Sequence, residues 1–334
     1  MSPRFLITGG SGFVGTHLVA HLSGRSANVA VLGTGVFARS ADVIGYRVDV
    51  RDSEAVRAAV QEFRPTHVCH LAAISSVAES WRQPRLAYEV NVLGTFNVLE
   101  AAMTLSQPAR VLNISTAQVY AASSQPLSET SSLGPENPYA ASKAMAELLA
   151  VQYRKVAEGG VITARSFNHA GPRQTPDYVL SSIAKQFAEM EAGMREPTLI
   201  VGNTHVRRDF TDVRDVVEAY FELLIKGTPG DIYNVCSGRA QSIRELIDEL
   251  VSISGLKIRI ESQEARRRAG EVEVVCGSPE KIRSTIDWRP KIPLRQTLKD
   301  LLDYWREKIA EDKPTSCQPA IEADPLPAMS QTKQ

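Results

Sequence analysis

The stretch FLITGGSGFVG, residues 5–15, decides what kind of fold this chain adopts. A short apolar run is followed directly by Gly9, Gly12 and Gly15, and a helical segment begins there. Glycine has no Cβ atom, so these positions permit a tight turn and a close approach of the backbone to a pyrophosphate. The positive end of the helix then faces the phosphates. A glycine triplet between the first strand and the first helix therefore predicts a dinucleotide-binding turn.

Apolar runs and helical segments alternate along the first half of the chain. We expect strands in residues 4–9, 28–33, 66–73 and 109–115, and helices in residues 15–23 and 53–63. Apolar runs that are bounded by turns and separated by helices indicate βαβ units and a parallel sheet buried on both faces. The predicted fold class is therefore α/β, with a Rossmann-type doubly wound parallel sheet.

The pattern loosens from about residue 165, where loops rich in Pro, Gly and Asn surround predicted helices over residues 178–193 and 242–254. We predict an NAD(P)-binding domain over residues 1–165, with a segment near 210–238 that crosses back to its sheet. A smaller C-terminal substrate-binding domain is predicted over residues 166–310. Residues 311–334 are polar and rich in proline, so they are expected to form a disordered tail.

The overall charge excludes some classes of protein. Lys and Arg together number 38, as do Asp and Glu, so the formal net charge is zero. A general nucleic-acid or membrane-surface binder would show a basic excess. No apolar run reaches the roughly 18 residues of a membrane span, the start lacks a signal-peptide layout, and the scattered cysteines indicate no metal site. We expect a soluble cytoplasmic protein with local anion sites.

The residues at the end of the second strand indicate whether the cofactor is NAD(H) or NADP(H). An acidic residue there would bind the ribose hydroxyls of NAD, but the strand ends in Gly33 and Thr34, and Arg39 follows. The missing acid and the nearby cation favour NADP(H), with NAD(H) still possible, although Arg39 could equally be a solvated loop residue. Asp49 and Val50, which follow the third strand, could hold the adenine.

Tyr139 and Lys143 form the candidate chemical pair. Their i, i+4 spacing in NPYAASK places them on one helix face. Tyrosine, with an ordinary pKa of about 10, is a poor acid or base at neutral pH. A neighbouring ammonium and a cationic nicotinamide favour the phenolate and are expected to lower this pKa. The alternative interpretation is an exposed helix pair, but Ser115 and Thr116 upstream favour the catalytic one.

The motifs TGGSGFVG, HLAA, NVLGT, ISTAQVY and NPYAASK together resemble the extended short-chain dehydrogenase/reductase family. The resemblance reaches to about residue 306. It implies that Tyr139 donates a proton to a carbonyl, that Lys143 lowers its pKa and binds the nicotinamide ribose, and that Thr116 hydrogen-bonds the reacting oxygen. Asn91 matches a structural and cofactor-side position, or it caps the helix that follows. The remaining cofactor contacts are expected at Phe13, Val14, Leu71, Ala72, Ala73 and Arg165.

The second half of the chain resembles one branch of that family. ARSFNHAGPRQ, VGNTHVRRDFTDVRDVVEAY and IYNVCSG look like the GDP-6-deoxy-D-mannose reductases, whose relatives are the GDP-mannose 4,6-dehydratases. The resemblance implies a GDP-sugar substrate, supplied by a separate upstream GDP-mannose 4,6-dehydratase, and a homodimer. The substrate contacts that we expect are Thr116, Gln118, Asn168, Lys185, Asn203, Arg208, Arg268 and Glu271. Guanidinium forks suit a diphosphate, although Arg266–Arg268 could instead be a solvated basic run.

Gln118 distinguishes between the two relatives. By the same resemblance, a 4,6-dehydratase carries a glutamate two residues after its catalytic threonine, as the base that removes the C5 proton. An amide does not accept a proton at physiological pH. We therefore expect NAD(P)H-dependent reduction of the C4 ketone of GDP-4-dehydro-6-deoxy-D-mannose to GDP-D-rhamnose. The alternatives are a dehydratase with a relocated base, a 4-epimerase, a reductase forming GDP-6-deoxy-D-talose, and a non-catalytic NADP-binding sensor.

Overall fold

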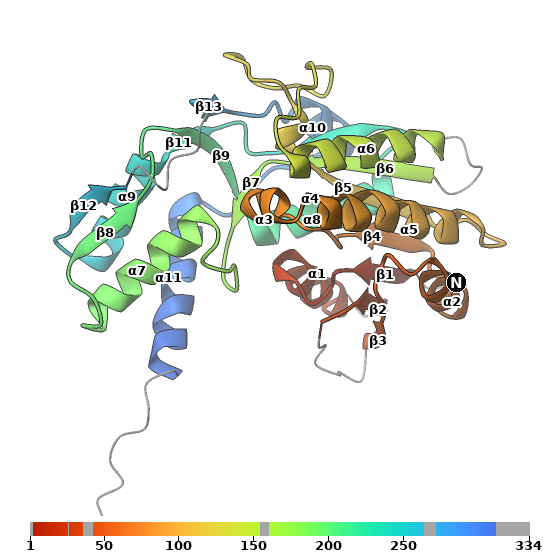
Figure 1. Cartoon of the computed structure of the whole chain (residues 1–334), viewed down its shortest axis with the longest axis horizontal. Coiled ribbons are helices and arrows are strands. Elements are labelled where there is room, and N and C mark those ends of the chain that lie inside the picture. Colours follow the sequence, from red (N-terminus) through yellow and green to blue (C-terminus); the bar gives the residue numbers. More distant parts are fainter. Residues whose placement is uncertain (1–2, 26, 36–42, 154–159, 264–271, 312–334) are drawn as a thin grey trace, which may run out of the picture.

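A sheet of seven parallel strands forms the core of the larger lobe (Figure 1). The computed structural model describes residues 3–25, 27–35, 43–153, 160–263 and 272–311. The strands of the sheet, from one edge to the other, are β10 (Ile232–Val235), β6 (Gly160–Ser166), β5 (Arg110–Thr116), β4 (His67–His70), β1 (Arg4–Thr8), β2 (Asn28–Gly33) and β3 (Val43–Arg47). This order confirms the predicted doubly wound α/β fold.

The strands are apolar because helices cover both faces of the sheet. All seven residues of β6 are buried, and Leu6 and Ile7 of β1 are fully enclosed. Successive side chains of a strand point to opposite faces of the sheet. A strand that is buried on both faces therefore needs a continuous apolar run. β4 ends at His70, three residues earlier than predicted, because Leu71–Ala73 leave the sheet and line a cleft.

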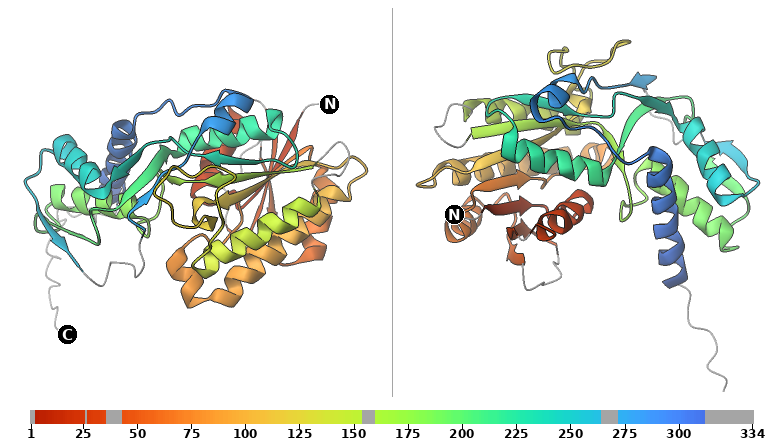
Figure 2. Two further views of the ribbon diagram at one scale, coloured as in Figure 1. Left: turned by 90° about the horizontal axis from the view of Figure 1, so that it is seen from above. Right: turned by 180° about the vertical axis from the view of Figure 1, so that it is seen from behind.

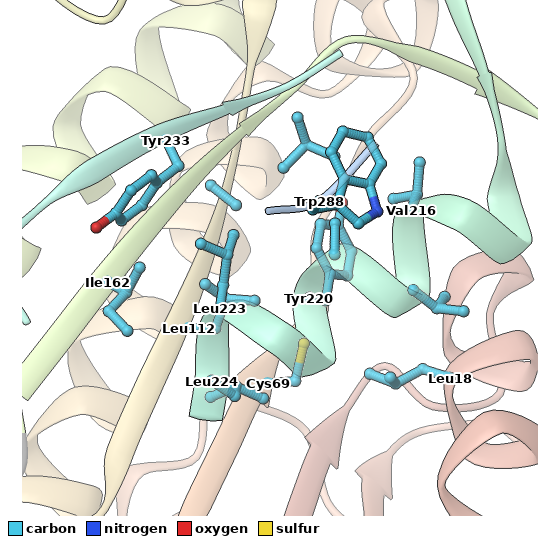
Figure 3. Close-up of a cluster of buried hydrophobic side chains, with 14 of the residues drawn as sticks. Leu18, Cys69, Leu112, Ile162, Val216, Tyr220, Leu223, Leu224, Tyr233 and Trp288 are labelled. Atoms are coloured by element: carbon cyan, nitrogen blue, oxygen red, sulfur yellow. The ribbon is translucent and has the colours of Figure 1, made fainter. Parts of the chain in front are cut away.

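In the first lobe, a different set of helices covers each face of the central sheet. On one face, α8 packs against α1 and the sheet, and Figure 3 shows Tyr220 and Leu223 of α8 in the same apolar cluster as Leu112 and Ile162 of the sheet. Apolar residues of α2, α5 and α6 form the cluster on the other face. The bounds are α1 (Phe13–Ser23), α2 (Ser53–Phe63), α3 (Val77–Arg82), α4 (Pro84–Tyr88), the π-helix η1 (Glu89–Leu93), α5 (Gly94–Met103), the 3₁₀ helix η2 (Ala117–Val119), α6 (Pro138–Gln152), α8 (Val213–Lys226) and α10 (Glu280–Ile286).

A second lobe lies beside the sheet and has its own apolar core (Figure 2). Phe187, Leu246 and Leu302 are buried where its three main helices meet. Its elements are α7 (Val179–Glu191), α9 (Ile243–Ser254) and α11 (Leu294–Glu311), the pair β8 (Thr198–Val201) and β12 (Arg259–Ser262), and a small sheet of β7 (Asn168–Ala170), β9 (Arg207–Asp212), β11 (Ala240–Ser242) and β13 (Val274–Val275).

The chain passes between the two lobes more than once. After β9 it enters α8, and β10 then pairs in parallel with β6 at the edge of the central sheet. α11 continues to Glu311, the first residue of the predicted tail, and the rest of that tail lies outside the described residues. No helix in the described part of the chain is long and apolar enough to cross a membrane.

The topology also predicts where a ligand binds. The strand order reverses between β1 and β4, and in open parallel sheets ligands bind outside the carboxyl ends of the strands at such a point.

Candidate active site

A cleft of ≈ 1140 Å³ opens at this edge of the sheet. Its walls come from both lobes, with Gly9, Thr116 and Tyr139 on the first lobe and Asn168 and Arg208 on the second. A cleft that runs from the glycine turn to a second lobe has room for a nucleotide cofactor and for a substrate beside it.

The glycine turn has the geometry that a pyrophosphate requires. Gly9 has φ +66°, and a Cβ atom there would lie 2.8 Å from the amide nitrogen of Ala72. A Cβ atom on Gly15 would lie 2.5 Å from the carbonyl oxygen of Gly9. The N-cap residue of α1, Gly12, provides no side-chain cap, and the first turn of this helix contains no acidic residue. Among the described residues, no side chain caps the amides at the start of α1, and the site fits a dinucleotide.

The residues that we expected beside the adenine lie at the far end of the cleft. Gly33, Thr34, Asp49 and Val50 line it as expected, whereas Arg39 lies outside the described residues. Arg51 also lines the cleft, and it pairs with Asp49 at 2.7 Å, which holds the pKa of that carboxyl below its usual range. Arg51 was not among the expected contacts, although VDVRD shows a basic residue two positions after Asp49.

Tyr139 is held at the start of α6. Asn137 caps this helix by accepting a hydrogen bond from the amide of Ala140 at 2.9 Å, and the backbone amide of Tyr139 donates to Ser80 Oγ at 3.2 Å. The side chains of Tyr139 and Thr116 both line the cleft. Burial raises the pKa of Tyr139 to about 12, and the neighbouring Thr116 hydroxyl opposes this only in part.

Lys143 lies one turn further along α6 than Tyr139, and we expected it to affect the pKa of that tyrosine. Its Nζ donates to the carbonyl oxygen of Ile114 at 2.8 Å, and burial lowers the pKa of Lys143 to about 8, although the charge of Glu147 opposes this. We expected Lys143 together with a cationic nicotinamide to lower the pKa of Tyr139; in the protein alone, burial raises it. The phenol is thus protonated at neutral pH, which is the state that a proton donor requires.

Gln118 lies in η2 and faces the cleft. Asn137 uses its Oδ1 atom as the cap of α6, so its Nδ2 atom is the group that meets Gln118, donating to Gln118 Oε1 at 3.1 Å. The amide of Gln118 therefore has its oxygen engaged and its NH₂ group left for the cleft. Among the described residues that line the cleft, the carboxylates are Asp49, at the adenine end, and Glu136.

Asn91 is fully buried inside η1 and does not cap the helix that follows. Its Oδ1 atom accepts from the amide of Ile74 at 2.8 Å, and its Nδ2 atom donates to the carbonyl of Ile74 at 3.0 Å and to Ser142 Oγ at 2.9 Å. Ser142 in turn donates to the carbonyl oxygen of Tyr139 at 2.8 Å. Asn91 thereby joins one wall of the cleft to the backbone of Tyr139 without lining the cleft itself.

His70 is a structural residue that the sequence analysis did not single out. Its Nδ1 atom is 2.7 Å from Thr8 Oγ1, and its Nε2 atom is 3.0 Å from Thr95 Oγ1. Thr8 Oγ1 also accepts from the amide of Ala72 at 3.1 Å, so the network fixes the wall formed by Leu71 and Ala72. Burial lowers the pKa of His70 to about 3, which keeps the ring neutral. Its signal was a histidine in an apolar strand, HVCH.

Asn168 and Arg208 line the cleft on the second lobe, whereas two other expected substrate contacts do not. Lys185 pairs with Glu189 at 3.5 Å and lies 5.6 Å from the ring centre of Trp305. Asn203 accepts a hydrogen bond from the backbone amide of His205 at 3.0 Å. Both side chains are engaged on the second lobe, away from the wall of the cleft. Arg268 and Glu271 lie outside the described residues.

Arg165, expected at the cofactor, is instead buried behind the cleft. It forms an ion pair with Glu147 of α6 at 2.7 Å, with side chains 4% and 5% exposed. Ser115 donates a further hydrogen bond to Glu147, and the guanidinium carbon of Arg165 lies 4.7 Å from the ring centre of Tyr120. A buried ion pair of this kind requires both partners, because either charge alone would be left unpaired in a medium of low dielectric constant. Arg165 thus holds β6 against α6.

The fold and the cleft define an NAD(P)-dependent oxidoreductase of the short-chain dehydrogenase/reductase class, with a glycine turn at one end and a Tyr139–Lys143 pair at the other. Within that class, the chain belongs to the GDP-mannose 4,6 dehydratase family, whose model matches residues 6–301.

Three relatives show how far the similarity extends. The chain is 37% identical over 315 residues to a GDP-6-deoxy-D-mannose reductase from Pseudomonas aeruginosa, with 93% of this chain and 100% of that protein covered. The structure of RMD from Pseudomonas aeruginosa complexed with NADPH has a TM-score of 0.82, with 92% and 99% of the two chains covered. A UDP-glucose 4-epimerase from Thermus thermophilus in complex with NAD is 33% identical, with a TM-score of 0.80 and coverage of 91% and 99%.

Proposed function

We propose that this protein is an NADPH-dependent reductase that converts GDP-4-dehydro-6-deoxy-D-mannose to GDP-D-rhamnose, with NADH as a possible second reductant. The observation that carries the proposal is the combination of Thr116, Tyr139 and Lys143 with an amide at Gln118. These residues suffice for a one-step reduction and do not include the base that dehydration needs at that position. The similarity to a GDP-6-deoxy-D-mannose reductase supports this choice.

We assign each of these residues a role that is compatible with its position. NADPH supplies the hydride that reduces C4. Tyr139, protonated at neutral pH, gives its phenol proton to the oxygen that forms at C4, and Thr116 holds both that oxygen and the phenol. Lys143, whose pKa is about 8, is positively charged at neutral pH and stabilises the cofactor ribose beside α6. On the second lobe, Asn168 lies on the sugar side and Arg208 binds the diphosphate.

A test with purified protein uses GDP-mannose and NADPH, with and without a separate GDP-mannose 4,6-dehydratase. We expect NADPH oxidation only when the dehydratase is present, because this chain then receives the ketone that it reduces. Identification of the product by NMR gives the configuration at C4 and separates GDP-D-rhamnose from GDP-6-deoxy-D-talose. Conversion of GDP-mannose by this protein alone would contradict the proposal.

Glu136 makes dehydration the second candidate function. It is exposed, lines the same cleft and lies two residues before α6, so it is the described carboxylate that could replace the missing base. If the protein alone converts GDP-mannose, replacing Glu136 by glutamine should abolish that conversion. A 4-epimerase would show interconversion of sugars without added reductant, and a sensor would bind NADPH without any turnover.

We also propose that the protein is a homodimer whose contact is formed by α6 and the η1–α5 region. Large apolar side chains are exposed there, with Leu93 56%, Met145 47%, Leu148 67% and Val151 44% exposed. A groove of ≈ 590 Å³ lies between α4, η1 and α6 and is lined in part by Leu93 and Met145. Exposed apolar surface of this kind marks protein interfaces. A symmetric contact would place four helices together.

Leu148→Glu is expected to weaken the dimer, because a symmetric contact would bring two carboxylates together in an apolar surface. The expected rise in the dissociation constant is on the order of 10²-fold, measured by sedimentation equilibrium. Met194→Glu is the matched control, since Met194 is 63% exposed but follows α7 in the second lobe. The proposed contact is refuted if both variants retain the mass of the wild type, or if the wild type is a monomer.

A further inference from the structure

The segment that joins β7 to α7 reaches back to the first lobe. The carbonyl oxygen of Pro172 accepts a hydrogen bond from His17 Nε2 of α1 at 2.9 Å. Six residues later, the hydroxyl of Tyr178 lies 2.8 Å from Ser75 Oγ, and these two residues are 103 positions apart in the chain. Tyr178 and Ser75 both line the cleft, from opposite lobes. Their hydrogen bond therefore spans the cleft.

Hydrogen bonds hold the backbone of Tyr178 and of the residue that precedes Ser75. The amide of Tyr178 donates to the carbonyl of Thr175 at 3.3 Å, and its carbonyl accepts from the amide of Ser182 at 2.8 Å at the start of α7. Ser75 follows Ile74, whose amide and carbonyl are both bound by Asn91. The bond thus connects two fixed points of the molecule, so it can transmit the position of one lobe to the other.

The bridge lies next to the residue that carries out the proposed chemistry. Tyr178 and Tyr139 both line the cleft, so the two phenol groups face the same space. Tyr178 is half-buried, and its hydroxyl is directed toward Ser75. A hexose that places its C4 atom beside Tyr139 must therefore fit next to this bridge.

We propose that the Ser75–Tyr178 hydrogen bond is a cross-cleft bridge that sets the spacing of the two lobes beside Tyr139. Ser75 and Tyr178 then act as positioning residues for the hexose ring, an inference that rests on the proposed function. Positioning of this kind affects the binding and orientation of the hexose ring, while the proton donor, Tyr139, is unchanged.

The test is a double-mutant cycle with Ser75→Ala and Tyr178→Phe. Each single variant is expected to raise the KM for the ketosugar by about 3–10-fold, the range for one hydrogen bond between neutral groups, with kcat within about twofold and its pH dependence unchanged. The double variant is expected to match the singles, because both remove the same bond. Tyr46→Phe is the control, since it removes a phenol bond to Glu62 (3.1 Å) at the far edge of the sheet.

A second measurement keeps this inference separate from the proposed function. Hydrogen exchange of the amides in residues 171–178, measured without substrate, should be faster in both single variants than in the wild type. If the wild type does not reduce the ketosugar but exchange accelerates in both variants, the bridge stands and the proposed function fails. Unchanged exchange in either variant overturns the bridge, and so does a rise in KM that multiplies in the double variant.

Discussion

Tyr139→Phe is expected to lower kcat for ketosugar reduction by about 10²–10⁴-fold, the usual contribution of a positioned general acid. The substitution keeps the ring, which is buried, and removes only the hydroxyl that lies beside Thr116. Without this phenol, the oxygen that forms at C4 has no positioned proton donor. Stopped-flow measurement of NADPH oxidation in a single turnover would report the chemical step directly.

Tyr120→Phe is the matched control for this prediction. Tyr120 is also a buried tyrosine that lines the cleft, but its hydroxyl donates to Asn234 Oδ1 at 2.6 Å behind the site. Its loss should lower the free energy of unfolding by about 1 kcal/mol and leave kcat within a few-fold of the wild type. NADPH affinity, measured by fluorescence titration, should remain the same in both variants. Unchanged single-turnover reduction in Tyr139→Phe would refute the assigned role.

Gln118→Glu is expected to introduce the proton abstraction that dehydration requires. Glutamate has nearly the same shape, and Asn137 Nδ2 would donate to one carboxylate oxygen as it now donates to Gln118 Oε1. The second oxygen would then face the cleft as an acceptor, where the wild type presents an NH₂ group. We expect the exchange of the C5 hydrogen of the ketosugar with solvent deuterium to rise by about 10²-fold or more.

This exchange is followed by NMR or mass spectrometry with oxidised cofactor bound, so that reduction does not compete. Gln118→Met is the control, because it keeps the length of the side chain without an ionisable group, and it should exchange as slowly as the wild type. Rapid C5 exchange in the wild type would show that a base is already present, with Glu136 as the first residue to test. Equal exchange in Gln118→Glu and the wild type would show that position 118 does not reach C5.

Local patterns in the sequence were sufficient for the fold and for the centre of the candidate site. The apolar runs and the glycine turn predicted the doubly wound sheet. A strand that is buried on both faces requires apolar residues throughout, and a turn without room for Cβ atoms requires glycine. The i, i+4 spacing placed Tyr139 and Lys143 on one face of α6, and the structure brings both to the cleft with Thr116. These features depend on neighbours in the sequence.

The second lobe was harder to predict because its functional side chains come from loops and short strands. The i, i+4 spacing of Lys185 and Glu189 is compatible with the ion pair that they form on α7. In the first lobe, nothing in the local pattern shows that Arg165 is buried against Glu147, since a charged residue reads the same whether it faces a ligand or another side chain. The cross-cleft bond between Ser75 and Tyr178 belongs to the same group, because it joins residues that are far apart in the chain.

The sequence by itself therefore determined the fold class, and it predicted the dinucleotide turn and the candidate reacting pair, which follow from backbone geometry and residue spacing. Only the tertiary structure decided the direction in which the pKa of Tyr139 shifts and the partners of Asn91, Arg165 and Gln118. Burial raises the pKa of Tyr139 against the expected effect of Lys143, and Asn137 sets which end of the Gln118 amide faces the cleft. Desolvation and hydrogen-bond direction depend on atoms that the chain brings together only when it folds.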